Sequence, residues 1–267
     1  MNAPAPSPAL LERVRAMQPL MQEAAALAMR MRPPAGAFAA AQKGAQDWVT
    51  EADGAVEAFL AARIGEAFPE DGFQGEEGGE ARQGQLRWVV DPIDGTSNYA
   101  RGRPRWCVSL GLLDGNEPVA GMLVAPVLGE TFLAVRGGGA TLNGAPIRAA
   151  DTTDPARSMV EIGWGSRVAQ QDYLSMSDRI MALGVAPRCG GCGALALADV
   201  ACGRQDGYVE ISINLWDVAA ALVLLGETGA RVSPFLRDGG LHGAIPILAA
   251  APGVADALSA ASGLALA

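Results

Sequence analysis

Two aspartates stand three residues apart in this chain, directly after an apolar segment. The stretch "WVVDPIDGTSNY" (88–99) begins with residues typical of a buried strand and continues into Asp91 and Asp94. Pro92 has no N–H to donate to a sheet, so we expect the strand to end at Asp91 and a turn to bring Asp94 to the same side. The carbonyl of Ile93 is then free to face inward. Three oxygens converging in this way are suitable ligands for a hard cation such as Mg²⁺.

The residues that follow predict an anion site beside these oxygens. "GTSNY" is expected to open a short helix, and the backbone amides of Gly95 and Thr96 at its start favour a bound phosphate. Carboxylates and an anion site are compatible when cations lie between them. The alternative interpretation of D-x-x-D-G is a turn in which Asp94 caps the helix.

Further acidic residues lie elsewhere in the chain. "GEEGG" contains Glu76 and Glu77 in a glycine-rich loop, and "NLWDVAA" contains Asp217 at the start of an apolar helix. A solvated loop and a helix cap are the structural alternatives for these two segments. We expect Glu76 to join the acidic cluster and Glu77 to support the loop.

These segments together resemble one enzyme family. "FQGEEGG", "WVVDPIDGTSNY" and "NLWDVAA", in this order and spacing, resemble the inositol monophosphatase family of magnesium-dependent sugar phosphatases, and "DWVTEAD" is similar to a further family segment. The match extends from about Lys43 to Asp217. It implies a phosphomonoesterase that hydrolyses inositol 1-phosphate or a similar small polyol phosphate with a metal-activated water.

The resemblance also implies a set of metal ligands. Glu76, Asp91 and the carbonyl of Ile93 would hold one Mg²⁺. Asp91, Asp94 and Asp217 would hold a second, so that Asp91 bridges the two ions. Two ions placed in this way can clamp an in-line displacement at phosphorus.

The resemblance also implies catalytic and phosphate-binding roles for other residues near these ions. Thr96 and Glu76 would orient the attacking water, and the amides of Gly95 and Thr96 would bind the phosphate. Asp53 would support Thr96 or a third, weaker Mg²⁺. Lys43, the only lysine in the chain, lies near a family lysine at the edge of the site, with a one-residue difference in spacing.

The substrate is less closely defined than the chemistry. Glu210 resembles the family glutamate that accepts hydrogen bonds from a sugar or inositol hydroxyl, and Asp94 and Arg188 are further candidate substrate contacts. Cys192 and Gly193 stand where relatives often carry a turn with Ser or Thr. Histidinol-phosphate phosphatase and 3'(2'),5'-bisphosphate nucleotidase therefore remain alternatives, as does a non-catalytic regulatory or binding protein of this fold.

Composition narrows the class of protein. The 267 residues carry a formal net charge of −9, without a basic run that would predict nucleic-acid binding. No apolar stretch approaches the about 20 residues of a membrane span, and the first residues do not read as a signal peptide. We expect a cytoplasmic protein that binds neither nucleic acid nor membrane. Cys189 and Cys192 form a C-x-x-C pair, which we expect to be reduced structural thiols because only one His is available for a zinc site.

The hydrophobic pattern predicts two halves. Helices are expected at 7–32 and 50–68, followed by antiparallel strands, so that residues 1–150 form an α+β half with most of the metal ligands. Residues 151–267 alternate strands and helices, as in an α/β half, and carry Asp217 and the substrate contacts. The family resemblance implies a layered αβαβα sandwich with an antiparallel first sheet, a mixed second sheet, the site between the halves, and a homodimer.

Overall fold

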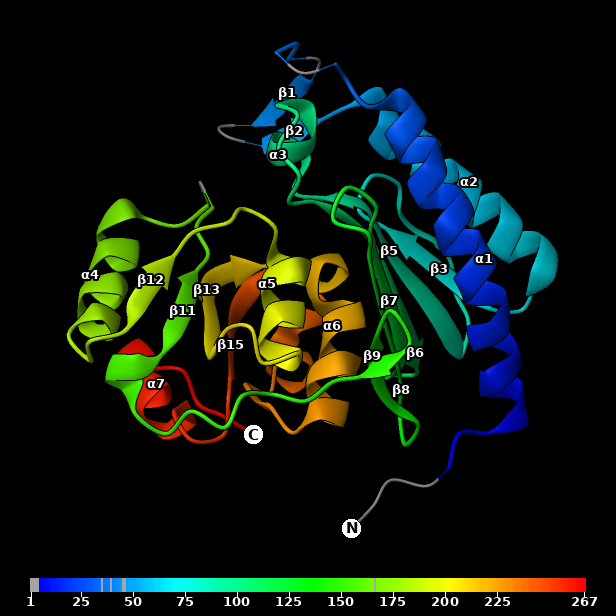
Figure 1. Ribbon diagram of the computed structural model, residues 1–267. Helices are drawn as coiled ribbons and strands as arrows, with labels where there is room; N and C mark the ends of the chain where they lie inside the picture. The colour runs from blue at the N-terminus through cyan, green and yellow to red at the C-terminus, as the bar shows by residue number, and fades with distance from the viewer. Residues whose placement is uncertain (1–4, 35, 39, 45–46, 166) are drawn as a thin grey trace.

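The computed structural model describes residues 5–34, 36–38, 40–44, 47–165 and 167–267. Its layers alternate helix, sheet, helix, sheet, helix across the molecule (Figure 1), which confirms the predicted sandwich. The outer helices are α1 and α2 on one side and α4 and α7 on the other, while α5 and α6 lie between the sheets. Within the described part of the chain the helices are α1 (Pro8–Met31), α2 (Glu51–Ala67), α3 (Thr96–Ala100), α4 (Gln170–Met181), α5 (Gly193–Ala201), α6 (Leu215–Thr228) and α7 (Ala255–Ser262).

The strands form two large sheets and a small hairpin within the described residues. The first sheet is eight-stranded, and its spatial order is β10 (Ala145–Pro146), β9 (Gly139–Leu142), β8 (Glu130–Val135), β7 (Glu117–Ala125), β6 (Cys107–Asp114), β5 (Leu86–Asp94), β3 (Gly72–Gly75) and β4 (Gly79–Arg82). The second sheet is five-stranded, in the order β12 (Ala186–Arg188), β11 (Met159–Ile162), β13 (Gly207–Ile213), β15 (Ile245–Ala250) and β14 (Arg231–Val232). The hairpin consists of β1 (Ala41–Gly44) and β2 (Asp47–Val49).

The first sheet is antiparallel as expected, with one exception. Strand β3 runs parallel to β5, because β4 returns along one edge of β3 and β5 then occupies the other edge in the direction of β3. The second sheet is mixed, as expected: β11 pairs in parallel with β12 and β13, whereas β15 pairs antiparallel with β13 and β14. The parallel pair in the first sheet brings the ends of β3 and β5 to the same edge.

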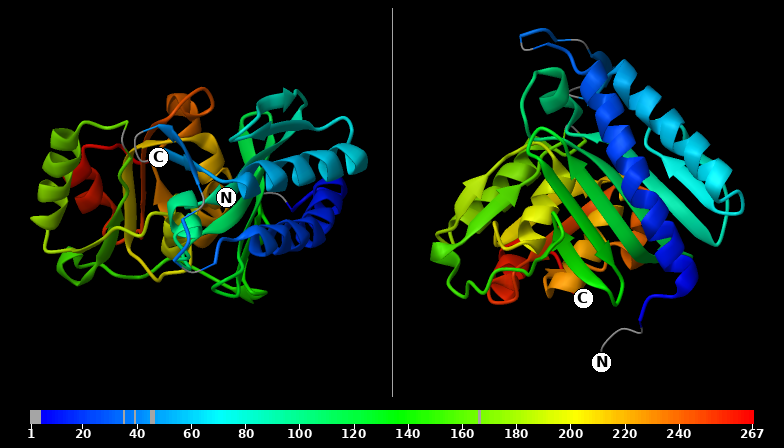
Figure 2. Two further views of the ribbon diagram at one scale, coloured as in Figure 1. Left: turned by 90° about the horizontal axis from the view of Figure 1, so that it is seen from above. Right: turned by 45° about the vertical axis from the view of Figure 1, so that its right-hand side comes forward.

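Helix α1 follows the local sequence signals closely. Ser7 is its N-cap, and the Ser7 side chain accepts a hydrogen bond from the backbone N–H of Leu10 at 3.2 Å. Pro8 occupies the first turn, where a missing N–H carries no cost. Seen from above, α1 and α2 cover the outer face of the first sheet (Figure 2), where their apolar residues join its core.

Two glycines allow α6 to pack directly on the first sheet. A Cβ on Gly121 of β7 would lie 2.2 Å from the carbonyl oxygen of Ala220, and one on Gly111 of β6 would lie 2.7 Å from the Cβ of Ala219. Any larger residue would push the helix away, so these glycines set the distance between α6 and the strands. The close contact holds the N-terminus of α6 near the end of β5.

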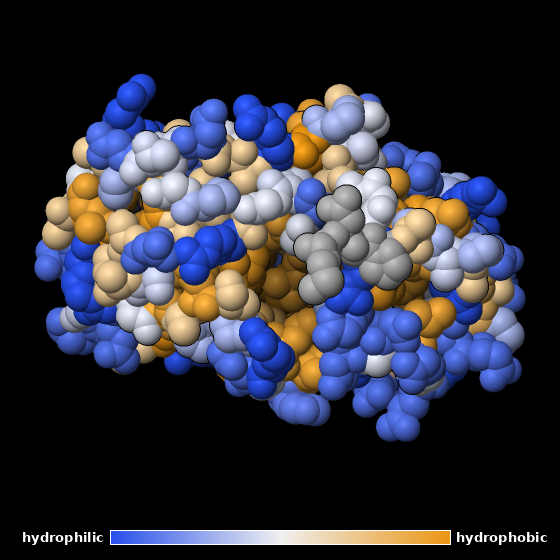
Figure 3. Space-filling model, turned by 90° about the horizontal axis from the view of Figure 1, so that it is seen from below, coloured by the Kyte–Doolittle hydropathy of each residue, from blue (hydrophilic) through white to orange (hydrophobic). Residues whose placement is uncertain are grey.

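The helices and one face of the surface were compared with what a membrane span requires. No helix among the described residues combines the length and the apolar character that crossing a bilayer requires. On the face seen from below, hydrophilic residues are interspersed with hydrophobic ones (Figure 3).

Candidate metal and phosphate site

A bulge in β5 brings the two aspartates to the same side. Asp91 pairs with Ser109 and Asp94 pairs with Cys107, so three residue steps on β5 face two on β6. One extra residue therefore bulges, and the side chains that strand alternation would place on opposite faces point the same way. The expectation that the strand ends at Asp91 is wrong, since β5 continues through Pro92 to Asp94. The backbone N–H of Ile93 donates to Asp91 Oδ1 at 3.0 Å and fixes that carboxylate.

Glu76 reaches the same edge of the sheet because β3 is parallel to β5. Gly75, the last residue of β3, is in register with Val90. The N–H of Glu76 then donates to the carbonyl of Val90 at 3.1 Å, one residue before Asp91. Residues that are 15 apart in the sequence thus become neighbours through strand pairing.

A buried glutamate of α2 holds the loop that carries Glu76. The Glu57 carboxylate accepts the N–H of Glu77 at 2.9 Å and that of Gly78 at 2.7 Å. A Cβ on Gly75 would lie 2.2 Å from this carboxylate, which explains the glycine. Glu77 also forms an ion pair with Lys43. Glu57 was not among the predicted site residues, although an acid on the buried face of an apolar helix indicates a hydrogen-bonded role.

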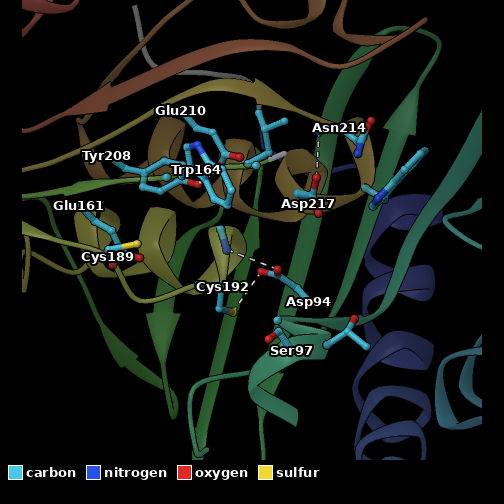
Figure 4. Close-up of a pocket in the computed structure, with 18 of the residues that line it drawn as sticks. Asp94, Ser97, Glu161, Trp164, Cys189, Cys192, Tyr208, Glu210, Asn214 and Asp217 are labelled. Carbon is cyan, nitrogen blue, oxygen red and sulfur yellow. Dashed lines mark hydrogen bonds between the residues drawn. The ribbon is translucent and has the colours of Figure 1, made fainter. Parts of the chain in front are cut away.

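Asp217 joins the cluster from the second half of the chain. It occupies the first turn of α6, where its Oδ2 accepts the N–H of Asn214 at 2.9 Å. One oxygen each of Asp91, Asp94 and Asp217 lie within 4.8 Å of one another. Figure 4 shows Asp94 and Asp217 facing the same pocket from different elements. The capping role and the cluster are therefore compatible.

Burial and mutual repulsion disfavour the negative charges of these carboxylates. Burial, reinforced by the charge of Asp217, raises the pKa of Glu76 to about 8. Burial and the charge of Asp94 raise the pKa of Asp217 to about 7. Burial likewise raises the pKa of Asp91 well above its ordinary value, with Glu76 as the next cause. An all-oxygen, crowded and buried carboxylate set of this kind fits a hard divalent cation, which would compensate the charge.

Thr96 lies between the acidic cluster and a buried aspartate. Its Oγ1 is 2.9 Å from the carbonyl oxygen of Ile93 and 3.3 Å from Asp53 Oδ1. Asp53 is fully buried, and its Oδ2 accepts the N–H and the hydroxyl of Thr50 at 2.8 and 2.6 Å. Gly95 precedes Thr96 with a φ of +87°, a left-handed conformation that favours glycine. The turn between β5 and α3 thereby fixes the direction of the Thr96 hydroxyl.

Helix α5 anchors Asp94 from the second half. The N–H groups of Ala194 and Gly193 donate to Asp94 at 2.6 and 3.3 Å, and the Cys192 thiol donates to Asp94 Oδ2 at 3.1 Å. Burial raises the pKa of Asp94, and these three hydrogen bonds oppose the rise. From the sequence, Cys192 was expected to be a structural thiol, and Cys192 with Gly193 a departure from a substrate-binding turn. Their contact with Asp94 was not predicted, because it spans about 100 residues.

A cleft of about 270 Å³ opens above the acidic cluster. Glu210 lines it, and the hydroxyl of Tyr208 donates to its carboxylate. Burial raises the pKa of Glu210 to about 8. The wall also contains Trp164 and Arg167, which no sequence motif singled out. The remaining lining residues include Trp48, Glu76, Asp94, Gly95, Thr96, Trp216 and Asp217.

Two further candidate residues, one predicted at the edge of the site and one as a substrate contact, are not among the residues that line the cleft. Lys43 Nζ is 3.6 Å from Glu76 Oε1, at the margin of the acidic cluster. Arg188 lies on β12, where it is exposed, and the structure does not place it among the residues that line the cleft.

Comparison with known proteins decides the family. The sequence model described as the inositol monophosphatase family matches residues 11–263. The chain belongs to the inositol monophosphatase family. It is 39% identical over 205 residues to an inositol-1-monophosphatase of Synechocystis, in a match that covers 73% of this chain and 69% of that protein. It is 38% identical over 196 residues to the Nus factor SuhB of Xylella fastidiosa, in a match that covers 73% of this chain and 71% of that protein.

Solved structures show the same fold. The extragenic suppressor protein suhB of Bartonella henselae superposes with a TM-score of 0.86 at 29% identity, over 94% of this chain and 98% of its own. The IMPase of Thermotoga maritima superposes with a TM-score of 0.84 at 27% identity, over 94% of this chain and 97% of its own. Relatives within the inositol monophosphatase family thus carry two kinds of names, phosphatase and Nus factor.

One feature of this family member couples the two halves beside the site. Arg105 donates to Asp199 and to Glu161, each at 2.9 Å, and so joins the segment after α3 to the second half. Asn98 donates to the carbonyls of Arg105 and Gly190 at 2.8 and 2.9 Å. These partly buried contacts position the turn before α5, and the N-terminus of α5 holds Asp94.

Proposed function

We propose that this protein is a magnesium-dependent phosphomonoesterase that hydrolyses inositol 1-phosphate or a similar small polyol phosphate. The observation that carries the proposal is the convergence of carboxylate oxygens of Asp91, Asp94 and Asp217 within 4.8 Å of one another, at the floor of a cleft. Such a cluster is costly unless it binds cations, and hard cations beside an anion site suit phosphoryl transfer.

The donor set supports two Mg²⁺ ions. Glu76, Asp91 and the carbonyl of Ile93 would hold one ion, and Asp91, Asp94 and Asp217 would hold the other. Mg²⁺ bound by these residues would acidify a water molecule and neutralise charge on the phosphoryl group and the leaving oxygen. The residues of the chain contribute the fixed positions of the ligands, through the β5 bulge and the first turns of α5 and α6.

Thr96 and Glu76 orient the attacking water in this proposal. The Thr96 hydroxyl has one hydrogen, which it gives to Ile93 O or Asp53 Oδ1, so its lone pairs remain available to accept from a water in the cleft. Asp53 acts through Thr96, because it is buried behind that hydroxyl. The Glu76 side chain, which also lines the cleft, would accept a hydrogen bond from the same water. The backbone amides of Gly95 and Thr96 bind the phosphate.

The size and polarity of the cleft support a small polyol as the alcohol. A volume of about 270 Å³ suits a single ring or a short chain with one phosphate. Glu210, with its pKa raised to about 8 by burial, carries a proton near neutral pH and can both donate to and accept from hydroxyl groups. Glu210→Ala should change the preference among phosphate esters more than the dependence on Mg²⁺, and an unchanged preference would remove Glu210 from substrate recognition.

A phosphate-release assay with and without Mg²⁺ tests the proposal. The panel contains inositol 1-phosphate, other polyol phosphates, histidinol phosphate and 3'(2'),5'-bisphosphorylated nucleotides. Asp94→Asn should abolish turnover with little loss of fold, while Asp151→Asn, at an exposed position, serves as the matched control. A near-normal rate for Asp94→Asn would show that Asp94 is not a ligand.

The panel also tests the non-catalytic alternative that relatives named Nus factor SuhB suggest. The intact acidic cluster favours an enzyme, because a binding protein of this fold has no need of crowded buried carboxylates. Folded protein that binds Mg²⁺ yet releases phosphate from none of the esters would favour the regulatory function instead.

A further inference from the structure

Two thiols lie behind Asp94, one from each half of the chain. Cys107 begins β6 and is fully buried, and Cys192 is the N-cap of α5 with 3% of its surface exposed. Both sulfur atoms and one carboxylate oxygen of Asp94 lie within 4.8 Å of one another. The Cys192 thiol donates to Asp94 Oδ2 at 3.1 Å, and Figure 4 shows Cys192 pointing toward Asp94.

This group differs in chemistry from the oxygen cluster beside it. Two sulfurs and one carboxylate suit a soft or borderline cation such as Zn²⁺, whereas Mg²⁺ takes oxygen ligands. Sulfur atoms around a tetrahedral Zn²⁺ are about 3.8 Å apart, so ligand atoms that already lie within 4.8 Å need only a small inward movement. Cys189, the other member of the C-x-x-C pair, is exposed and lies outside this group.

The surroundings can accommodate the charge of such a site. Each thiol would release its proton to solvent when a cation binds, as thiol ligands of metals do. Two thiolates and a carboxylate would leave a Zn²⁺ site with one net negative charge. The positive charge of Arg105 favours the ionised forms of Asp94 and Cys107 and offsets part of that excess.

We propose that Cys107, Cys192 and Asp94 form a binding site for a soft divalent cation such as Zn²⁺, separate from the Mg²⁺ sites but sharing Asp94 with them. Cys192 lines the cleft and gives the cation its route of entry, with a solvent molecule as the fourth ligand. A cation bound here would compete with Mg²⁺ for Asp94 and would therefore inhibit phosphate release. This expected inhibition rests on the proposed phosphatase function, whereas the binding of the cation does not.

The binding is tested on reduced protein free of other metals. Titration with Co²⁺ or Cd²⁺ should produce a thiolate-to-metal charge-transfer absorption that saturates at one ion per chain. The absorption should persist in Cys202→Ser and Cys189→Ser and disappear in Cys107→Ser and Cys192→Ser. No absorption in the parent protein, or an absorption that depends on Cys189 rather than Cys107, would overturn the proposal.

The inhibition is tested by adding Zn²⁺ at constant Mg²⁺, with each rate expressed relative to the same variant without Zn²⁺. The inhibitory Zn²⁺ concentration should rise by at least about tenfold in Cys107→Ser and remain unchanged in Cys202→Ser. If Zn²⁺ inhibits both variants equally, the proposal that Zn²⁺ competes with Mg²⁺ for Asp94 is wrong. If the protein hydrolyses no ester, the absorption experiment still decides whether the site exists. Should Cys107→Ser fail to fold, Cys107→Ala, which preserves a small apolar side chain, replaces it in both experiments.

Discussion

Replacing the glutamate at position 210 by glutamine should stabilise the protein, and the gain should grow as the pH rises. Burial raises the pKa of Glu210 from 4.5 to about 8, and the charges of Asp217 and Asp94 contribute to the rise. The unfolded chain loses this proton near pH 4.5, whereas the native protein keeps it until about pH 8. Between these values the unfolded state binds fewer protons, so native stability falls as the pH rises. Glutamine has nearly the same shape and no proton to lose.

The size of the effect follows from the two pKa values. Each pH unit within the window costs about 1.4 kcal/mol of native stability. At pH 7, about 2.5 units above the unfolded value of 4.5, the native protein holds a proton that the unfolded chain has lost, and this difference costs about 3 kcal/mol. This figure is an upper bound, because the cleft leaves part of the carboxyl in contact with water. The side-chain amide introduced by Glu210→Gln keeps an oxygen that can accept from the Tyr208 hydroxyl, so the hydrogen bond is retained.

Urea unfolding without divalent cations, at about pH 5, 7 and 8.5, measures the gain. The matched control is Glu80→Gln, which changes an exposed glutamate on β4 and should give the same small difference at every pH. If Glu210→Gln and the parent unfold at the same urea concentration at all three pH values, or if the gain shrinks with rising pH, the account of the cleft electrostatics is wrong.

Three further predictions concern the metal site and its support. Thr96→Ala should lower kcat by about a hundredfold with little change in KM, while Thr96→Ser, which retains the hydroxyl beside Ile93 O, should keep most of the rate in steady-state assays. Mg²⁺ should raise the melting temperature because it relieves charge crowding; at 100 times its dissociation constant the stabilisation is about 2.7 kcal/mol. Asp217→Asn should abolish most of that shift in thermal unfolding scans with and without Mg²⁺; an equal shift would exclude Asp217 as a ligand. Arg105→Met should destabilise the protein by about 3 kcal/mol or more in urea unfolding, because the Glu161 carboxylate, with a side chain only 4% exposed, loses its ion pair.

Local sequence patterns were sufficient to predict much of the fold and to select the candidate site residues. The Ser7 cap, the apolar faces of α1 and α2 and the strand before Asp91 depend on interactions within a few residues, which backbone sterics and periodicity determine. The order and spacing of the acidic segments led to the same family that the comparisons show.

The tertiary structure alone decided how those residues meet. Strand alternation would place Asp91 and Asp94 on opposite faces, and only the pairing of β5 with β6 shows the bulge that reverses this. Likewise, the parallel pairing of β3 and β5 places Glu76 beside Asp91. These contacts arise from the choice of strand partners, and a single strand's sequence does not specify its partner.

The same holds for contacts between the halves. Asp94 is held by α5, and Cys107 approaches Cys192, across separations of about 100 and 85 residues that carry no shared local pattern. The close packing of α6 on the first sheet and of α5 beside it brings these groups together. The sequence by itself therefore determined which chemistry the chain carries, since residue types set ligand chemistry. The packing of two sheets around α5 and α6 decided which of those residues share one site, because distance in space depends on the whole core and not on neighbours along the chain.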